Sequence, residues 1–269
     1  MGDQGEKIVW KIGSKSNVDD LGLRTDRLSH YADQFADQIE RGNMPIGVIS
    51  GAIAMANAMY LETEEKCSDE AITPQMRATR GNAAFFVTWI MALDNLGIKA
   101  GELLVTHHEL NYKPETKSFI DTVEDYLSVG WVPLINESGS TDDKETKKLV
   151  YGGDNDGLGE VVADRTMADR ICFLTEEEGL IGKDGQLIEV VDAHNAKEAL
   201  EAAGEPGKLG SGGMRSKVEA ALKAAGKGRP AHIAHAKYAF ELIRNHAVGT
   251  FFVPTNLPKH SRIVINTCD

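Results

Sequence analysis

Cysteine is scarce in this chain of 269 residues: it has three, and no two of them form a CxxC pair. Widely separated thiols in odd number suggest neither a disulfide framework nor a thiolate zinc site. No window approaches the roughly 18 apolar residues of a membrane span. The first residues, MGDQGEKIVWKIG, lack the apolar core of a secretory signal. We therefore expect a reduced, cytoplasmic protein with no membrane partner.

Positive charge is also in short supply. The chain has 29 Lys and Arg against 41 Asp and Glu, which gives a formal net charge of -12. A nucleic-acid surface needs clustered cations, so we expect no nucleic-acid partner. Any site for a polyanion has to assemble its own local positive charge. The hydrophobic fraction of 42% is that of an ordinary globular protein.

Short apolar runs alternate along the chain with amphipathic stretches, which is typical of strands separated by helices. This order favours parallel pairing, so we predict an α/β fold: a three-layer α/β/α sandwich around a mainly parallel central sheet. The predicted strands are Lys7–Ile12, Ile46–Ser50, Lys99–Thr106, Trp131–Asn136, Arg170–Thr175, Leu187–Val191, His232–His235 and Thr250–Val253. The predicted helices include Leu28–Ile39, Pro74–Leu96, Thr116–Ser128, Leu158–Thr166, Ala196–Ala202 and Arg215–Ala225. Thr73 is the predicted N-cap of the second of these, with Pro74 at its first helical position.

Several familiar motifs do not occur. The chain has no GxxxxGK[ST], no GxGxxG after the first strand and no Gly-x-Ser-x-Gly, so a Walker site, a dinucleotide fold and serine hydrolase chemistry have no support. The triplet His107-His108-Glu109 lacks a later histidine at helical spacing, and we interpret it as polar residues at a strand end. We predict no metal-ligating residues. The polar segment Glu137–Leu149 predicts a solvated hairpin or a mobile lid, and the tail Thr255–Asp269 has one short apolar run.

Two stretches place small residues directly after a strand, where ligands bind in parallel sheets. The first, WKIGS, carries Lys11 inside an otherwise apolar strand before Gly13 and Ser14. Such a lysine either serves an anion or snorkels from an edge strand. The second, VISGAIAMANAM, passes from a strand into a helix through Ser50-Gly51-Ala52. It is either a close strand–helix joint or a set of backbone donors for an oxyanion.

Two further stretches lead into helices. In YGGDNDGLGEVVADR, Asn155 and Asp156 stand where a helix begins, as caps or as functional side chains. In GSGGMRSK, glycines lead into an amphipathic helix that bears Lys217 in its early turns. A flexible linker would continue as low complexity on both sides, and this stretch does not. We therefore predict a helix entrance that brings backbone amides and Lys217 close to a phosphate.

Six short stretches in one order resemble the amino acid kinase family, and within it most closely the glutamate 5-kinases. The family pattern runs Lys-x-Gly-Ser, Ser-Gly-Ala-Ile-Ala, Val-Pro-Ile-Ile-Asn-Glu-Asn-Asp, Gly-Asp-Asn-Asp-x-Leu, Leu-Thr-Asp-x-x-Gly-Leu and Gly-Thr-Gly-Gly-Met-x-Thr-Lys. The counterparts in this chain are WKIGS, SGAIA, VPLINES, GDNDGL, LTEEEGL and GSGGMRSK. The resemblance covers roughly residues 7 to 253. It implies the carbamate kinase-like fold in one domain over residues 1–269, with an acceptor-binding part up to about residue 165 and a nucleotide-binding part from about 166.

The resemblance implies roles for individual residues and identifies ATP and Mg²⁺ as the cofactors. Lys11 and Lys217 would neutralise the transferring phosphoryl group, and Asp156 would organise the two lysines. The residues that would contact ATP are Lys11, Gly13, Ser14, Thr175, Glu176, Gly212, Gly213, Met214 and Lys217. The residues that would contact the acceptor are Ser50, Gly51, Ala52, Asn136 and Asn155. Family members usually form homo-oligomers, so the resemblance also implies a dimer or tetramer.

The chain departs from the family pattern mainly where the acceptor is chosen. Asn-Glu-Asn-Asp reads Asn136-Glu137-Ser138-Gly139, so Gly139 stands where an aspartate would hold the α-amino group of the substrate. Asp142 or Asp143 is a candidate substitute. The family's Ala-Val-Gly-Gln reads TRGN, ending at Asn82, and Glu176 replaces the usual aspartate. We also expect the C-terminal RNA-binding-like domain common in bacterial glutamate 5-kinases to be absent.

Three functions follow as hypotheses. The first is ATP-dependent phosphorylation of the γ-carboxylate of L-glutamate, the first step towards proline. The second is a kinase of the same fold that acts on another small carboxylate or phosphate, which Gly139 favours. The third is a non-catalytic relative that only binds a nucleotide or anion, against which the two lysines and Asp156 together argue, since binding alone does not need that set.

Overall fold

The central sheet has eight strands. The computed structural model describes residues 5–19, 22–62, 73–138, 155–205, 213–238, 242 and 248–255. The strand order is β5-β6-β4-β1-β7-β9-β10-β8, and every neighbouring pair is parallel except β9 and β10. The strands are β1 (Lys7–Ile12), β4 (Met44–Ile49), β5 (Ala100–Val105), β6 (Val132–Glu137), β7 (Arg170–Thr175), β8 (Val190–Val191), β9 (Ala231–His235) and β10 (Thr250–Phe252). The predicted α/β fold with a mainly parallel sheet is confirmed.

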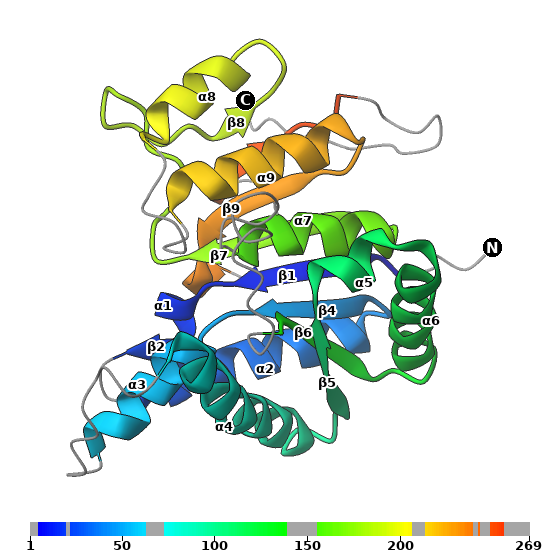
Figure 1. The fold of residues 1–269 in the computed structure, drawn as a ribbon. Helices are drawn as coiled ribbons and strands as arrows, with labels where there is room; N and C mark the ends of the chain where they lie inside the picture. Colours follow the sequence, from blue (N-terminus) through cyan, green and yellow to red (C-terminus); the bar gives the residue numbers. More distant parts are fainter. Residues whose placement is uncertain are drawn as a thin grey trace.

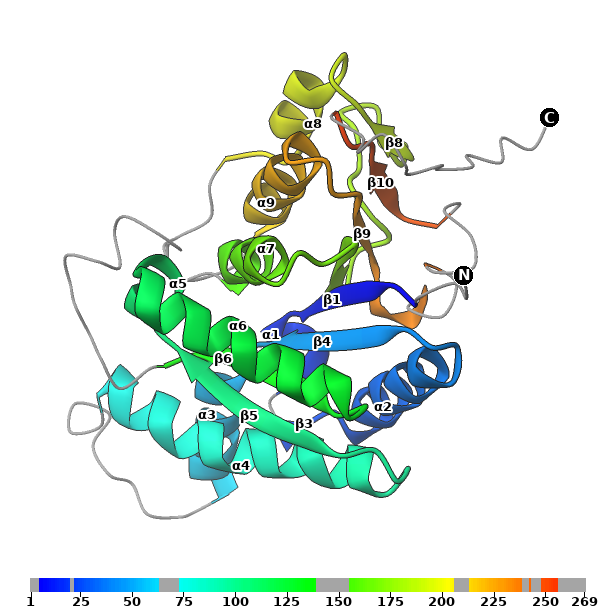
Figure 2. The same cartoon turned by 90° about the vertical axis from the view of Figure 1, so that its right-hand side faces the viewer.

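Helices cover both faces of this sheet and complete the three layers (Figure 1). α2 and α4 pack on one face, and α5, α6, α7 and α9 pack on the other. Figure 2 shows α7 and α9 on one side of β1 and α2 on the opposite side. The helices are α1 (Ser14–Asn17), α2 (Thr25–Glu40), α3 (Ala52–Glu62), α4 (Pro74–Asp94), α5 (His107–Asn111), α6 (Lys113–Ser128), α7 (Asn155–Arg165), α8 (Ala196–Ala202) and α9 (Met214–Gly226). Two short strands, β2 (Val18–Asp19) and β3 (Gly22–Leu23), pair antiparallel as a separate small sheet.

The period-2 alternation of β1 decides which side chains reach which layer. Ile8, Trp10 and Ile12 pack into the core under α2 and α4, while Val9 packs into the core under α7 and α9. Lys11 shares the face of Val9 and is 3% exposed. Because β1 is a central strand, paired with β4 and β7, Lys11 is not a lysine that snorkels from an edge. The sequence pattern therefore aims one charged side chain at the layer of α7.

Each half of the sheet is formed by one half of the chain. β5, β6, β4 and β1 come from the first half of the chain, and β7, β9, β10 and β8 come from the second. The two halves meet where β1 pairs with β7 over five residue positions, from Ile8 opposite Arg170 to Ile12 opposite Leu174. The two halves therefore form one continuous sheet, and α7 packs over the junction between β1 and β7.

Local signals explain where several elements begin. Thr73 caps α4 as predicted: its hydroxyl accepts a hydrogen bond from the backbone N–H of Met76, and proline follows at the first helical position. Gly213 is the N-cap of α9, so the glycine-rich stretch does lead into a helix. β1, β7 and α8 have the predicted bounds. Most other predicted bounds differ by one to three residues, as expected where helix and strand ends fray.

Two predictions about elements were wrong in detail. Only Val190–Val191 of the predicted strand Leu187–Val191 pairs with β10, while Leu187 forms an isolated antiparallel bridge to Ile181. The His107–Glu109 triplet is not a strand end but begins α5. The carboxylate of Glu109 accepts hydrogen bonds from the backbone N–H and the hydroxyl of Thr106, which is a capping arrangement that the triplet alone did not reveal.

Most of the predicted polar loop after Ser138 and of the tail after Thr255 lies outside the described residues. Among the helices that the structure describes, none is both long enough and apolar enough to cross a membrane.

Candidate active site

Two lysines and an aspartate from three separate elements meet beside the carboxyl end of β1. Lys11 Nζ lies 2.5 Å from Asp156 Oδ1, and Lys217 Nζ lies 3.1 Å from Asp156 Oδ2. The aspartate side chain is fully buried, and the lysine side chains are 3% and 8% exposed. Buried charges are costly unless they are paired. Two cations share one carboxylate here, so the cluster has one cation in excess for an anionic ligand.

The first turns of α7 and α9 bring this cluster together. Asp156 lies in the first turn of α7, and the hydroxyl of Ser216 in α9 lies 2.8 Å from Asp156 Oδ2 and 2.8 Å from the carbonyl oxygen of Gly213. Gly159, one turn further along α7, makes room for Lys11, because a Cβ there would lie 3.3 Å from Lys11 Cγ. Helix N-termini carry partial positive charge, which adds to that of the lysines.

Amide side chains form a second cluster beside the first. Asn155 Nδ2 donates to Ser50 Oγ at 2.8 Å and to Asn136 Oδ1 at 2.6 Å, and Asn136 Nδ2 donates to Asn82 Oδ1 at 2.9 Å. These residues come from α7, the end of β4, β6 and α4. Since Asn155 and Asp156 are neighbours in α7, the amide cluster adjoins the lysine pair. It is a neutral, hydrogen-bonded wall, suited to orienting a small polar molecule.

The turn after β1 is fixed by an asparagine that the sequence did not single out. Asn17 is buried, and its amide donates to the carbonyl oxygens of Gly13 at 3.1 Å and Ser50 at 2.9 Å. It therefore ties the end of β1 to the end of β4. Gly13 has φ of -74° and is the N-cap of α1, in which Ser14 is the first residue and is exposed.

No contact among the described residues requires a glycine at position 13 or 213. A Cβ on Gly13 would lie 3.8 Å from its nearest neighbour, and a Cβ on Gly213 would lie 4.0 Å from its nearest neighbour. Both have negative φ. Within the described residues, packing and backbone conformation thus leave both glycines unexplained. Space for a ligand that approaches the backbone closely would explain them.

The joint between β4 and α3 does need its glycine. Gly51 has φ of +146°, where side chains are strained, and a Cβ would lie 3.0 Å from Val18 Cγ2. Ala52 follows it as the first, buried residue of α3. Gly81 in α4 packs against this joint so closely that a Cβ would lie 1.7 Å from the carbonyl oxygen of Ala52. The strand–helix joint, and with it the predicted acceptor contact Ser50, is therefore held by tight packing.

The predicted nucleoside contacts lie at the end of β7. Thr175 is its last residue and pairs in register with His235 of β9. Glu176 Oε2 lies 3.4 Å from Arg24 and 3.3 Å from Arg27, so its carboxylate is held by two arginines near the start of α2. Burial and the cations Arg27 and Lys237 lower the pKa of His235, against the opposite effect of Glu176. Glu176, Arg24 and Arg27 therefore form a charged cluster that joins the end of β7 to the start of α2.

The structure brings most of the predicted site residues to one edge of the sheet, except Gly212, which lies outside the described residues along with Gly139. Met214 opens α9 beside Lys217. Sequence reasoning did not identify Asn17, Asn82, Gly159 or Ser216 as part of the site. Ser216 was within the quoted GSGGMRSK stretch, and Asn82 ends the TRGN stretch that departs from the family pattern. Asn17 carried no signal, because only the fold brings it to Ser50.

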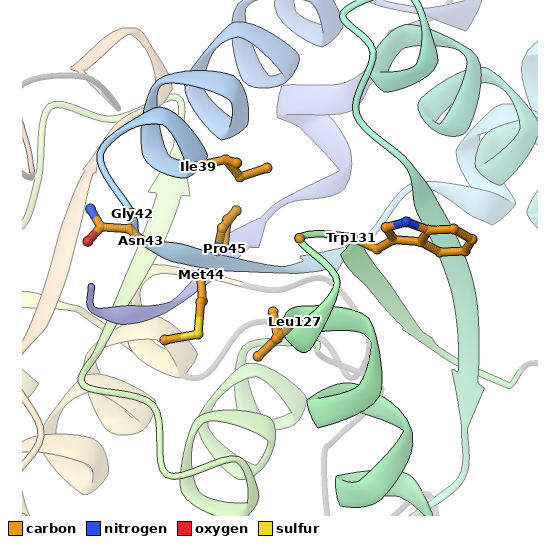
Figure 3. Close-up of a pocket in the computed structure, with 8 residues that line it drawn as sticks. Ile39, Gly42, Asn43, Met44, Pro45, Leu127 and Trp131 are labelled. Atoms are coloured by element: carbon orange, nitrogen blue, oxygen red, sulfur yellow. The ribbon is translucent and has the colours of Figure 1, made fainter. Parts of the chain in front are cut away.

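A cavity of about 180 Å³ lies at the opposite, amino-terminal edge of the sheet. Figure 3 shows Ile39, Met44, Pro45 and Leu127 around it, with Trp131 at one side. These residues come from the starts of β4 and β6 and the ends of α2 and α6. Ligands of parallel sheets bind at the carboxyl ends, so this cavity is separate from the lysine and amide clusters.

The described residues do not offer a ready-made metal cage. Among them, no group of three or more His, Cys, Asp or Glu side chains is placed to hold an ion. The buried carboxylate of Asp156 is already shared by two lysines and Ser216. A magnesium ion would therefore depend on the phosphates of a nucleotide for most of its ligands, as is usual for this ion.

A model of one protein family matches most of the chain: the model described as the amino acid kinase family matches residues 6–235. The glutamate 5-kinase of Acinetobacter baumannii (strain SDF) is 32% identical over 238 residues, which is 85% of this chain and 61% of that protein. The glutamate 5-kinase of Corynebacterium diphtheriae is 29% identical over 257 residues, 93% of this chain and 66% of that protein. The chain thus spans about three fifths to two thirds of the length of these curated relatives.

Solved structures share the fold at low sequence identity. Carbamate kinase from Giardia lamblia bound to AMP-PNP has a TM-score of 0.68 at 11% identity, and the likeness covers 93% of this chain and 98% of that one. UMP kinase from Bacillus anthracis has a TM-score of 0.59 at 12% identity, covering 93% of this chain and 97% of that one.

Proposed function

The chain belongs to the amino acid kinase family, and we propose that it transfers the γ-phosphoryl group of ATP to the γ-carboxylate of L-glutamate. One observation carries the phosphoryl-transfer part: Lys11 and Lys217, from opposite halves of the chain, meet on the single buried carboxylate of Asp156. The two lysines would neutralise charge on the transferring group. The glycines Gly13 and Gly213, which no contact among the described residues requires, would let phosphates reach the backbone.

The proposed chemistry needs no general base. The carboxyl group of glutamate has a pKa near 4.3 and is ionised at neutral pH, so one of its oxygens can attack phosphorus directly. What the protein must supply is in-line positioning and neutralisation of charge in the transition state. Asp156 is therefore an electrostatic organiser that holds both ammonium groups in place, rather than a proton acceptor. Magnesium supplies further neutralisation when it is bound to the nucleotide.

The neutral amide wall would orient the acceptor. Ser50, Asn136 and Asn155 are already linked by hydrogen bonds and adjoin Asp156 through the chain. A set whose members are already held by hydrogen bonds loses little conformational freedom when it binds a substrate. The likeness to glutamate 5-kinases at about 30% identity supports glutamate as the acceptor.

One specific feature favours a second candidate, a kinase of the same fold with a different small carboxylate or phosphate as acceptor. The described wall of Ser50, Asn82, Asn136 and Asn155 has no carboxylate, and Gly139 stands where family members have the aspartate for the α-amino group. An acceptor without an ammonium group would need no such partner.

A panel of acceptors separates these candidates. Purified protein is incubated with Mg²⁺ and ATP, ADP release is followed, and hydroxylamine is added to trap acyl phosphates as hydroxamates. Hydroxamate that depends on L-glutamate supports the first candidate. Product with another acid, such as one lacking the amino group, supports the second. Nucleotide binding without turnover on any acceptor would overturn both and leave a binding protein.

A further inference from the structure

The helices α7 and α9 are joined by charged side chains along their whole shared length. They lie side by side and parallel (Figure 1). Acidic residues stand four apart on α7, and each of them meets a cation of α9 or of the residues just after it. The contacts are Asp156 with Lys217 at 3.1 Å, Glu160 with Lys223 at 2.6 Å and Lys227 at 2.9 Å, and Asp164 with Lys227 at 2.9 Å.

Glu160 is the middle contact, and its burial is unusual. Its side chain is completely buried, whereas Lys223 and Lys227 are 57% and 35% exposed and reach inward from the surface. Neither carboxylate oxygen has a well-aligned hydrogen bond, so the contacts are ion pairs. Burial lowers the pKa of Lys227, but Glu160 and Asp164 outweigh this and raise it. Among the described residues, the direct ion pairs of this carboxylate are with these two cations at the end of α9, and Arg229 adds a weaker electrostatic attraction.

Stability alone is a poor explanation for such a group. A buried ion pair often contributes no more than well-packed apolar residues of the same volume would, and its best-attested use is to fix register. Ala220, Ala221 and Ala224 make the surrounding α9 surface smooth and apolar. Small apolar side chains interlock weakly, so they place little restriction on sliding of α9 along α7. The buried charge of Glu160 restricts this sliding strongly, because its partners Lys223 and Lys227 have fixed positions on α9.

The register of α9 matters because Lys217 is part of it. Lys217 and Lys223 are six residues apart, about 9 Å along one rigid helix, and Asp156 and Glu160 are one turn apart on the other. Sliding of α9 by a single residue, about 1.5 Å, would break the 3.1 Å contact of Lys217 with Asp156. Glu160, through its contacts at the C-terminal end of α9, thus sets the register that places Lys217 on Asp156 at the N-terminal end of the same helix.

We propose that Glu160 is a positioning residue for phosphoryl transfer: through Lys223 and Lys227 it sets the register of α9 on α7 and so places Lys217 on Asp156. This inference rests on the proposed phosphotransferase function. No atom of Glu160 has to touch a substrate, because its effect reaches the site along α9.

The test compares Glu160→Gln with Glu219→Gln. Glu219 lies on α9, the helix whose register Glu160 would set from α7, and forms an exposed ion pair with Arg215, so it is a matched control. We expect Glu160→Gln to lower kcat about 10- to 100-fold, as a displacement near 1 Å does, with KM for ATP and acceptor changed less than threefold and the melting temperature nearly unchanged. Glu219→Gln should keep the kcat of the unaltered protein. Unchanged kcat in Glu160→Gln, or a loss that simply follows the unfolded fraction, overturns the proposal.

A double variant separates register from a direct electrostatic effect of Glu160 on the site. Lys223→Met with Lys227→Met removes the partners and has the opposite effect on local charge. If Glu160 acts through register, this double variant lowers kcat as Glu160→Gln does, and adding Glu160→Gln to it causes little further loss. Opposite effects on kcat in the two variants, or fully additive losses, contradict positioning through α9.

Hydrogen exchange gives a readout that does not depend on turnover. In Glu160→Gln, the backbone amides at the start of α9, from Met214 to Val218, should exchange at least about tenfold faster, which corresponds to about 1.4 kcal/mol of local stability. Glu219→Gln should leave those amides unaffected. If the unaltered protein has no turnover but this change is seen, the proposed function fails while the positioning role of Glu160 stands. Unaltered exchange overturns that role.

Discussion

Asp156 places a full negative charge where no water reaches it, and its cost is met by two lysines. This arrangement makes each member of the set depend on the others. Removing one lysine leaves a neutral pair, whereas removing the aspartate leaves two buried cations that repel each other. The residues of the site are therefore coupled, and their variants will not have additive effects.

Substitution of Lys217 or Asp156 should remove turnover without removing the fold. We expect Lys217→Ala and Asp156→Asn each to lower kcat by about 100-fold or more, since each loses a preorganised charge at the transferring group. Steady-state ADP release measures the effect, and circular dichroism checks the fold. Lys183→Ala, at an exposed ion pair with Glu201, is the control. Near-normal turnover in both site variants would remove the proposed mechanism.

The thiol of Cys172 should be inert in the native protein. Burial in β7 raises its pKa to about 12 from 9.0. The unfolded state releases this proton from about pH 9 upward and the native state does not, so stability falls as pH rises from about 9 to 12, by up to about 1.4 kcal/mol per pH unit. Denaturant unfolding at pH 9 to 10 should show a shallower decline in Cys172→Ala. Rapid alkylation of the native Cys172 peptide at pH 8 would contradict this placement.

At the scale of elements, helices are positioned by close contacts at glycines and by charges. α3 and α4 meet at Gly81, where backbone touches backbone, and α7 and α9 meet through the charged contacts of Glu160. The first contact lies beside Ser50, on the side where we propose that the acceptor binds, and the second lies on the helix that carries Lys217, where we propose that the phosphates bind. Both contacts lie outside the site, and each would position residues of the site because a helix is rigid.

Alanine at position 81 should destabilise the protein although alanine favours helices. The added Cβ would lie 1.7 Å from the carbonyl oxygen of Ala52, so α3 and α4 must separate. We expect a loss of about 1–3 kcal/mol in the free energy of unfolding and a higher KM for the acceptor, because Ser50 precedes this joint. Urea unfolding and steady-state kinetics measure the two effects.

Gly226→Ala is the matched control for that variant. Gly226 ends α9, and a Cβ there would meet nothing within 4 Å. It should be neutral or stabilising by up to about 1 kcal/mol. Equal destabilisation by the two variants would mean that the contact at Gly81 is not the cause.

At the scale of the whole molecule, the site joins the two halves of the sheet. Lys11 lies in β1, in the first half of the chain, and Lys217 lies in α9, in the second half. We propose that the first half, to about residue 165, binds the acceptor and the second half binds the nucleotide, within one domain. Because β1 pairs with β7 and α7 packs over both, we expect the halves to unfold as one cooperative unit.

Nucleotide binding should therefore stabilise the whole molecule in a single step. With MgATP analogue at about 100 times its Kd, the free energy of unfolding should rise by about 2.7 kcal/mol, which is about 5–10 °C in melting temperature. Calorimetry should show one transition that moves as a unit, and the shift should be smaller in Lys217→Ala. Two transitions, of which only one responds to the analogue, would show that the halves unfold independently.

Periodicity and short motifs in the sequence were sufficient for much of this picture. The WKIGS stretch marked Lys11 as a charged residue inside an apolar strand, the Thr73-Pro74 pair marked the start of α4, and the glycines before Met214 marked the start of α9. These signals are local: each depends on residues within one turn or one strand. The alternation of strands and helices favoured a parallel sheet, and the six motifs in order resembled a family of kinases.

What only the tertiary structure decided are contacts between distant segments. Asn17 holds Ser50, Asn82 holds Asn136, and Glu160 meets Lys227, at separations of 33, 54 and 67 residues in the chain. Polar residues of these types occur throughout a chain with 26% charged residues, so their identity carries no local signal. The sequence by itself determined which elements form and which residue types line their ends. The packing of helices on the sheet decided which of those residues meet, because burial selects partners in space and not along the chain.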